Sequence, residues 1–347
     1  MKRPVLSICI PTYNRGETLA ANVRAWLDAA PAEGLEIVVS DNASTDGTPR
    51  TFAEITDPRL VFVRGESNVG AFANQLRAFE LASGSWVMQL TDKDGIFPET
   101  LPQALAELAG LEATCGRFIL QYGEERTSCK TEFHRAAAAY SRFGLAYAHP
   151  SGVFFRMDVL RRYGLLDTLR TLGERTHPFS TDYLTSLCLQ HGGHATIGIP
   201  FVRHNLPPYG AGRRSATYDS GRTWYFTPEF VFDEFVEYVR FLQGTLKMNP
   251  IRRAAVLSGI VRRSLLARMT EAYRNTLNNS DMCDWYGVPE DIRSRELTRD
   301  HEGYFLKRTT AATGELGAWD AWFIRRAAQR RWKRIKEQRR EHEDQVK

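Results

Sequence analysis

Short apolar runs alternate with amphipathic segments through the first part of the chain. Runs of the kind found in buried strands cover 5–10, 36–40, 60–64 and 86–90. Between them, apolar residues at helical spacing predict helices over 18–30 and 48–55 and a third that opens at 68–70. Strands that alternate with helices are typical of βαβ units, so the pattern predicts an α/β fold with a mostly parallel sheet.

From Thr227 onward the chain has helical periodicity only. A stretch rich in Pro, Gly and Ser at 206–226 predicts a flexible loop or linker, and 227–347 predicts a helical extension with one helix from Thr227 and another over 251–273. The extension ends in a basic tail that begins with two tryptophans. Its residues are Trp319, Trp322, Arg325, Arg326, Arg330, Arg331, Lys333, Arg334, Lys336, Arg339 and Arg340.

Composition narrows the class of protein. With 43% hydrophobic and 25% charged residues, the 347-residue chain has the composition of a soluble globular protein, and it contains no apolar run of the roughly 18 residues that a membrane helix needs. Its five cysteines are scattered and odd in number, which favours a reducing compartment and excludes a CxxC zinc site. The first predicted strand is not followed by GxGxxG, which argues against a dinucleotide-binding dehydrogenase.

Two carboxylates one residue apart follow the fourth predicted strand. Asp92 and Asp94 stand directly after the apolar run 86–90. At the carboxyl edge of an α/β sheet, where ligands bind, they could hold Mg²⁺ or Mn²⁺ and through it a diphosphate. An Asp-x-Asp pair also occurs in ordinary solvated turns, so the surrounding sequence has to decide.

Several segments together resemble the family 2 glycosyltransferases of GT-A fold. These are the strand and loop at 7–15, the strand and turn at 36–48, Asn68-Val69-Gly70 with Asn74, and Asp92-Lys93-Asp94 with Pro98, in that order and spacing. The resemblance covers roughly 4–205. It implies a Rossmann-like GT-A fold, mostly parallel and flanked by helices, whose nucleotide-sugar-binding half is 1–110 and whose acceptor-binding half is 111–205.

The resemblance also implies roles for individual residues. Asp41 would accept a hydrogen bond from a pyrimidine ring, Asp92 would meet the ribose or a metal-bound water, and Asp94 would ligate the cation. His204, after the last strand, would complete the metal site. The remaining donor-binding residues would be Pro11, Thr12, Asn14, Arg15 and Asn68. As alternatives from the residues themselves, Asp41 and Asp46 could cap the helix at Thr48, and His204 could be structural.

The general base is predicted at Asp182. The family usually has Glu-Asp here, whereas this chain has Thr181 and Asp182. One carboxylate suffices to deprotonate an acceptor hydroxyl in an inverting displacement. The alternative is that Asp182 caps a helix over 183–190, with Glu174 as the reserve base. A second departure is Lys93, which could point to solvent, contact phosphate or weaken the metal site.

The sequence therefore predicts an inverting, Mn²⁺- or Mg²⁺-dependent glycosyltransferase that uses a UDP- or dTDP-sugar. The resemblance implies a glycan or lipid-linked glycan acceptor in bacterial surface polysaccharide biosynthesis. An inactive binding scaffold and a nucleotidyltransferase are the alternatives.

Two basic segments outside the predicted catalytic residues have interpretations of their own. The basic tail predicts contact with an anionic membrane surface, hence a cytoplasmic location with peripheral attachment to the inner membrane; nucleic-acid binding and a solvated charged helix are the other interpretations. Arg213 and Arg214 could belong to a lid over the diphosphate or to a plain linker.

Overall fold

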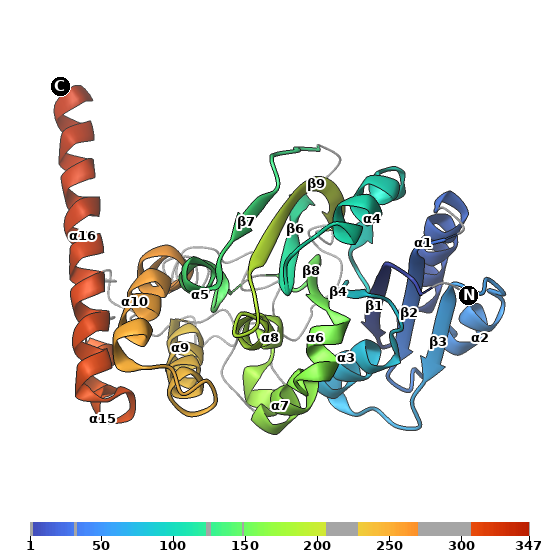
Figure 1. The fold of residues 1–347 in the computed structure, drawn as a ribbon, viewed down its shortest axis with the longest axis horizontal. Helices are drawn as coiled ribbons and strands as arrows, with labels where there is room; N and C mark the ends of the chain where they lie inside the picture. The colour runs from blue at the N-terminus through green and yellow to red at the C-terminus, as the bar shows by residue number, and fades with distance from the viewer. Residues whose placement is uncertain are drawn as a thin grey trace. The chain divides into compact units, whose positions relative to one another are not determined.

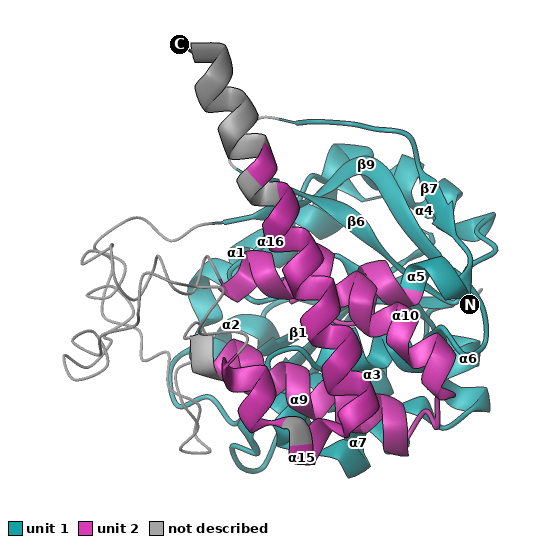
Figure 2. Cartoon of the chain, turned by 90° about the vertical axis from the view of Figure 1, so that its left-hand side faces the viewer, with its two compact units in different colours: residues 1–139, 148–207 teal, residues 140–147, 208–347 magenta. Residues whose placement is uncertain are grey.

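A computed structural model describes residues 3–30, 33–122, 126–147, 149–205, 228–269 and 307–346 (Figure 1). The chain divides into two compact units (Figure 2). Unit 1 consists of residues 1–139 and 148–207, and unit 2 of residues 140–147 and 208–347. The predicted linker 206–226, with the proposed lid residues Arg213 and Arg214, lies outside the described residues. The boundary predicted at residue 110 stays a prediction.

Unit 1 is built on a mixed sheet whose first four strands are parallel. The strand order is β3-β2-β1-β4-β8-β6-β9-β5, and β7 pairs with β9. Leu6 is in register with Leu35 on one side and with Trp86 on the other. The parallel strands are β1 (Leu6–Thr12), β2 (Leu35–Asp41), β3 (Leu60–Arg64) and β4 (Trp86–Gln89). The predicted α/β fold with a mostly parallel sheet flanked by helices is therefore confirmed for this unit.

The later strands turn the sheet into a mixed one. β8 runs antiparallel to β4 and β6, and β9 runs parallel to β6 and antiparallel to β5 and β7. The pairing of Gly95 with Arg203 brings the residues that flank β5 beside the end of β9. These strands are β5 (Gly95–Ile96), β6 (Cys115–Tyr122), β7 (Glu132–His134), β8 (Val153–Arg156) and β9 (His194–His204).

Helices cover both faces of the sheet because its central strands are apolar on both sides. On one face, α1 (Gly16–Ala29) and α4 (Leu101–Ala109) bury leucines against Ile8, Met88 and Phe154 in one continuous core. On the other face, α3 (Gly70–Leu81) packs on β1 and β2, and α8 (Ser180–Cys188) packs on β6 and β8 (Figure 1). The remaining helices are α2 (Thr48–Ala53), α5 (Ala136–Phe143), α6 (Met157–Arg162) and α7 (Leu165–Leu172), with 3₁₀ turns at Pro98–Thr100 and Glu174–Thr176.

The described residues of unit 2 are helical, as the sequence predicts. Phe232, Phe235 and Leu242 on α9 are fully buried, so the predicted apolar stripe is the core-facing side of that helix. The segment predicted over 251–273 is α10 followed by a π-helical turn at Val261–Leu265, and its last residues, 270–273, lie outside the described ranges. The helices are α9 (Pro228–Gly244), α10 (Pro250–Ile260), α15 (Thr313–Leu316) and α16 (Ala318–Val346). Among the helices of the described ranges, none has both the length and the apolar content to cross a bilayer.

Candidate active site

Polar residues from three parallel strands meet at the carboxyl edge of the sheet. Thr12 ends β1 and is the register partner of Asp41, which ends β2. The Thr12 hydroxyl donates a hydrogen bond of 3.1 Å to Asp92, in the turn that follows β4. Strands β1, β2 and β4 thus bring these three predicted donor-binding residues to one edge, as expected for an α/β ligand site.

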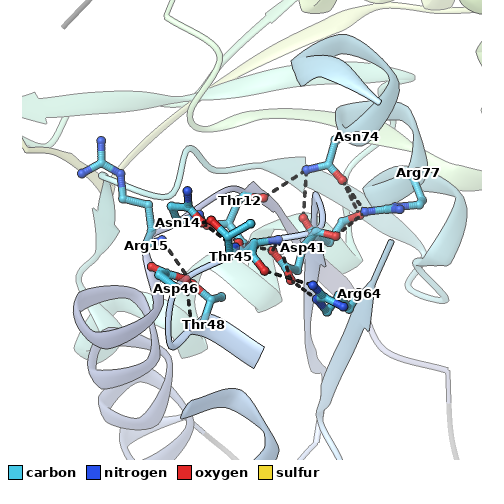
Figure 3. A network of polar contacts seen from close by, with 12 residues as sticks. Thr12, Asn14, Arg15, Asp41, Thr45, Asp46, Thr48, Arg64, Asn74 and Arg77 are labelled. Carbon is cyan, nitrogen blue, oxygen red and sulfur yellow. Dashed lines mark hydrogen bonds and ion pairs between the residues drawn. The ribbon is translucent and has the colours of Figure 1, made fainter. Parts of the chain in front are cut away.

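Asp41 is fully buried in a network of polar contacts (Figure 3). Its carboxylate accepts a hydrogen bond of 3.1 Å from the backbone N–H of Ser44, and Nε of Arg64 lies 3.6 Å from Oδ2. Arg77 donates to the Asp41 carbonyl at 2.6 Å. The Asp41 carboxylate is fully buried, whereas the Arg64 side chain beside it is half-exposed. The role of Asp41 as a base acceptor stays a prediction.

The two aspartates of this turn have different partners. Asp46 accepts from the backbone N–H of Thr48, the first residue of α2, at 2.9 Å, but the N-cap of that helix is Gly47, so Asp46 bonds to the helix start from the position before the cap. The carboxylate of Asp41 bonds to Ser44 in the preceding turn and not to the first turn of α2. Burial would raise the pKa of Asp46, but hydrogen bonds from the Thr48 side chain and from the backbone N–H groups of Thr48, Gly16 and Asp46 together lower it.

The loop after β1 is fixed against the turn after β2. Asn14 has a positive φ of 55°, its side-chain oxygen accepts from the backbone N–H of Thr45 at 2.8 Å, and its own N–H donates to Ser44. The Arg15 guanidinium points away from this network (Figure 3). Pro11 is the last but one residue of β1 and is partly buried. Asn14 therefore has a structural role in this loop, and Arg15 is the group that reaches outward.

Asn68 has a structural role in this arrangement. Its side-chain oxygen accepts from the Asn42 amide at 2.7 Å and from the N–H of Gly70 at 2.9 Å, so it holds the start of α3 against the turn after β2. Asn74, inside α3, is buried and its amide donates to the Ser40 carbonyl at 2.9 Å. Whether Asn68 also contacts a ligand stays a prediction.

Asp94 is the hub of a second buried cluster. Its Oδ1 lies 2.8 Å from Nδ1 of His204 and accepts from the N–H of Asn205 at 3.1 Å. Its Oδ2 accepts from the hydroxyls of Thr91, at 2.6 Å, and Ser151. Asp94 therefore joins the turn after β4 to the end of β9 and to the segment before β8.

His149 belongs to this cluster, and reasoning from the sequence missed it. Its Nε2 lies 3.5 Å from Oδ2 of Asp94, and its ring centre is 4.3 Å from that of His204. Asp94, His149 and His204 each offer a ligand atom within 4.8 Å of the others. His149 precedes β8, which pairs antiparallel with β4. No residue spacing in the sequence predicts that β4 and β8 pair. The only local signal for His149 is that a histidine and a proline precede an apolar strand.

The electrostatics of the cluster prepare a cation site at neutral pH. Burial lowers the pKa of His149 to about 4; Asp94 opposes that shift, and the charges of His204 and Lys93 add to it. Burial alone would raise the pKa of Asp94, but hydrogen bonding from His204, the neighbouring His149 and the two hydroxyls lower it to about 2. Asp94 is thus an anion and His149 a neutral imidazole at pH 7, which are the forms that bind divalent metal.

The ligand atoms of Asp94, His149 and His204 fit a divalent cation if His149 adopts the tautomer that leaves Nε2 free to ligate. A carboxylate oxygen and two imidazole nitrogens suit Mn²⁺ or a later transition metal better than Mg²⁺, which prefers oxygen ligands. Asp94 and His204 already face one another, so a cation could replace the proton that they share. The N–H of Ser151 donates to Nδ1 of His149 at 3.2 Å, which leaves the His149 proton on Nε2. Ligation by that nitrogen would require the other tautomer.

Asp182 lies in the first turn of α8, which begins earlier than the sequence suggests. The helix starts at Ser180 and its N-cap is Phe179, so Asp182 is buried inside the helix and does not cap it. Beside it, the buried Thr181 hydroxyl has no hydrogen-bond partner within the described structure. This residue stands where the family usually has Glu. The reserve candidate Glu174 has its carboxylate close to Gly70, at the start of α3.

A buried chain of amides ties α8 to the strand that precedes Asp92. The Ser180 hydroxyl donates to Oε1 of Gln75 at 2.8 Å, and Nε2 of Gln75 donates to Oε1 of Gln89 at 2.5 Å. Gln89 is the last residue of β4, and its carbonyl accepts from the N–H of Gly152 at 2.8 Å. Gln89 thereby links the helix of Asp182 with the segment of His149.

Comparisons with known proteins agree with this geometry. Residues 7–164 match the family model of glycosyl transferase family 2. The succinoglycan biosynthesis protein ExoO of Rhizobium meliloti is 31% identical over 115 residues, which are 32% of this chain and 32% of that protein. The chain spans about a third of the length of the curated relatives it matches.

Two solved structures share the fold. Staphylococcus aureus TarS 1–349 has a TM-score of 0.57 at 14% identity, covers 93% of this chain and is itself covered to 90%; it has also been solved with UDP and with UDP-GlcNAc. The mannosyltransferase PcManGT of Pyrobaculum calidifontis, solved with GDP-Man and Mn²⁺, has a TM-score of 0.50 at 16% identity, with 94% of this chain and 85% of that chain covered. At these identities the likeness concerns the fold.

Proposed function

We propose that the protein, whose residues 7–164 match the model of glycosyl transferase family 2, transfers a sugar from a UDP- or dTDP-sugar to a hydroxyl group of a glycan. The observation that carries the proposal is the cluster of Asp94, His149 and His204, beside the polar carboxyl edge formed by Thr12, Asp41 and Asp92. A diphosphate held at the cluster would extend the donor toward that edge, where the predicted nucleotide contacts lie.

Asp182 is proposed as the general base of an inverting displacement. It would take the proton of the acceptor hydroxyl while that oxygen bonds to the anomeric carbon and the bond from that carbon to the diphosphate breaks on the opposite face. Positioned proton removal typically contributes about 10²–10⁴-fold to the rate. The buried link through Ser180, Gln75 and Gln89 would hold Asp182 in place relative to β4.

Asp94 and His204 would hold the metal, with His149 at the third position. When bound, the divalent cation would act as a Lewis acid that offsets the charge of the departing nucleoside diphosphate. The two imidazoles favour Mn²⁺ over Mg²⁺. Lys93 is half-buried, and its charge lowers the pKa of His149. Because its charge acts on the cluster, Lys93 is proposed to contact the donor phosphates.

The acceptor is proposed to be a glycan or lipid-linked glycan of a bacterial surface polysaccharide. The role of ExoO in succinoglycan biosynthesis supports this class. Its handling at the cytoplasmic face of the inner membrane would be consistent with the basic residues of α16, which would contact anionic lipid. These assignments rest on likeness between proteins and not on a contact in this chain.

Release of nucleoside diphosphate from a panel of nucleotide sugars tests the proposal. We expect release that requires Mn²⁺, is lost with EDTA and is lost in Asp94→Ala but kept in Asp158→Ala, a matched change of an exposed aspartate. Release of pyrophosphate in place of nucleoside diphosphate would identify a nucleotidyltransferase. Donor binding by calorimetry without release, with and without glycan acceptors, would identify a scaffold.

A further inference from the structure

Unit 2 has a groove lined by arginines that the proposed chemistry does not use. It lies between the end of α10 with its π-helical turn and the middle of α16, and its volume is about 640 Å³. One wall carries Ser258 and Arg262. The other consists of these α16 residues: Trp322, Phe323, Arg326, Ala327, Arg330, Arg331 and Arg334.

The α16 wall has an ordered composition along the helix. Trp322, Arg326, Arg330 and Arg334 follow one another at four-residue steps and form one stripe, with successive side chains about 6 Å apart along the axis. The neighbouring stripe, at the same spacing, is Trp319, Phe323, Ala327 and Arg331. Aromatic rings thus occupy one end of the groove and guanidinium groups the other.

Among the described residues, no acidic side chain compensates the positive charge of the groove. The segment of α16 from Trp322 to Arg334 contains no acidic residue. Arg330, Arg331 and Arg334 form no ion pair with any residue of the described ranges, and the described lining of the groove includes no carboxylate. Five guanidinium groups around one cavity repel one another, and a bound anion would relieve that repulsion. The nearest acid along α16 is Glu337, which pairs with Lys333 at 3.8 Å and does not line the groove.

The far wall supplies a cation from a different part of the sequence. Arg262 donates from Nε to the Ser258 carbonyl at 3.0 Å, which holds its side chain along the wall of the groove. On α16, the Arg326 guanidinium stacks 5.2 Å from the Trp322 ring centre. Both arginines are therefore oriented by neighbours that leave part of each guanidinium for an outside ligand.

Exposed apolar side chains lie at the aromatic end. Trp319 is 53% exposed and Trp322 47% exposed, and Ile251, at the start of α10, is 79% exposed. The two helix starts are joined by a buried ion pair of 2.8 Å between Arg253 and Asp320. A soluble polyanion offers no partner for an exposed isoleucine, whereas a bilayer surface accepts such residues and tryptophan rings at the level of its headgroups.

We propose that this groove binds the phosphate groups of anionic phospholipids at a bilayer surface, with Arg262 and the α16 arginines as its ligands and Ile251, Trp319 and Trp322 as the apolar contact. The proposal deepens the membrane part of the proposed function and rests on it. The basic tail predicts only a general attraction to anionic lipid. The groove is instead a defined site that is built from two segments separated in the sequence.

Flotation with vesicles tests the site in the full-length protein. With vesicles of phosphatidylglycerol and phosphatidylcholine, Arg330→Gln/Arg334→Gln should partition about thirtyfold more weakly than wild type, because each basic side chain at an anionic surface contributes about fivefold. Arg262→Gln alone should weaken partitioning about fivefold on the same basis. Pure phosphatidylcholine vesicles should not bind either protein measurably.

The matched control is Arg240→Gln/Lys307→Gln, which removes the same charge from unit 2 at two residues that do not line the groove. It should weaken partitioning less than about threefold, because salt screens charges over about 8 Å. Equal loss in both double variants, or no loss in Arg262→Gln, would overturn the site. So would binding of the wild type to a single-stranded oligonucleotide without binding to the anionic vesicles.

Folding and catalysis are followed separately. Far-UV circular dichroism checks that each variant is folded, and inorganic phosphate added to the flotation should compete if the groove recognises phosphate. Nucleoside diphosphate release in the absence of vesicles should be unchanged in the groove variants. Groove variants that no longer float with vesicles but still release nucleoside diphosphate would support the lipid site. A wild-type protein that binds vesicles but releases no nucleoside diphosphate would count only against the glycosyltransferase proposal.

Discussion

Nδ1 of His204 lies 2.8 Å from Oδ1 of Asp94, although 110 residues separate them in the chain. The contact exists because β5, directly after Asp94, pairs antiparallel with the last residues of β9. The same carboxylate receives two hydroxyls and faces the His149 ring. A single side chain therefore couples three segments, and changes to its neighbours should separate metal binding from folding.

The two histidines should contribute unequally to metal binding. His204→Ala should weaken Mn²⁺ binding by more than about 100-fold, and His149→Ala by about 10-fold, because ligation by Nε2 of His149 requires a tautomer that the N–H of Ser151 disfavours. Titration calorimetry with Mn²⁺ measures both, with His191→Ala as the control for an exposed imidazole. A greater loss in His149→Ala would make that residue the primary ligand.

The metal-free protein should lose stability as the pH falls from about 6.5 to about 4. The pKa of His149 is lowered to about 4 from the ordinary 6.5 by burial, so in this window the unfolded chain binds the proton that the folded protein excludes. The loss should be roughly 2 kcal/mol, allowing for partial exposure. Urea unfolding in EDTA should show this loss of stability in wild type and not in His149→Gln. If the free energy of unfolding depends on pH in the same way in both proteins, the loss is not due to His149.

A second window concerns Asp94. Its folded pKa is about 2, below the ordinary 3.8, so its stabilising contribution is complete above pH 3.8 and disappears as the pH falls toward 2. Asp94→Asn should remove this dependence. The measurement is the same urea series continued to low pH, and an unchanged slope in the variant would mean that other carboxylates control acid unfolding.

Asp182→Asn should lower kcat by about 10²–10⁴-fold with little change in the donor KM, because only proton removal is lost. Steady-state transfer to an accepted glycan measures both constants. Asp158→Asn, at an exposed position of α6, controls for loss of a carboxylate. A kcat within a few-fold of wild type would exclude Asp182 as the base and turn attention to Glu174.

Gln75→Leu should destabilise the protein and slow the reaction. The substitution leaves Gln89 and Ser180 without their buried partners, at a cost of about 1–3 kcal/mol each. We also expect a lower kcat, because α8 would no longer be held to β4. Urea unfolding and kinetics measure the two effects, and Gln103→Leu on the exposed side of α4 is the control. Stability lost without any change in kcat would remove the positioning role.

Much of the fold follows from the sequence alone. The strand at Leu60–Arg64 has the predicted bounds, and β1, β2 and β4 differ from prediction by one or two residues, because buried parallel strands are continuous apolar runs. The carboxyl ends of those strands must share one edge, so Asp41 and Asp92 could be brought together by reasoning. The sequence also predicts α9, because apolar residues recur along it at helical spacing.

Tertiary structure decided what depends on antiparallel pairing and on helix packing. His149 joins Asp94 only because β8 turns back along β4, and no local periodicity records which strands pair. The buried amides of Gln75 and Gln89 resemble surface residues in the sequence, yet packing makes them a link to α8. Likewise, Arg262 faces the arginines of α16 only once the two helices pack. Apolar periodicity determines whether a segment forms a helix or a strand. The contacts between distant segments form only when those helices and strands pack together in one core.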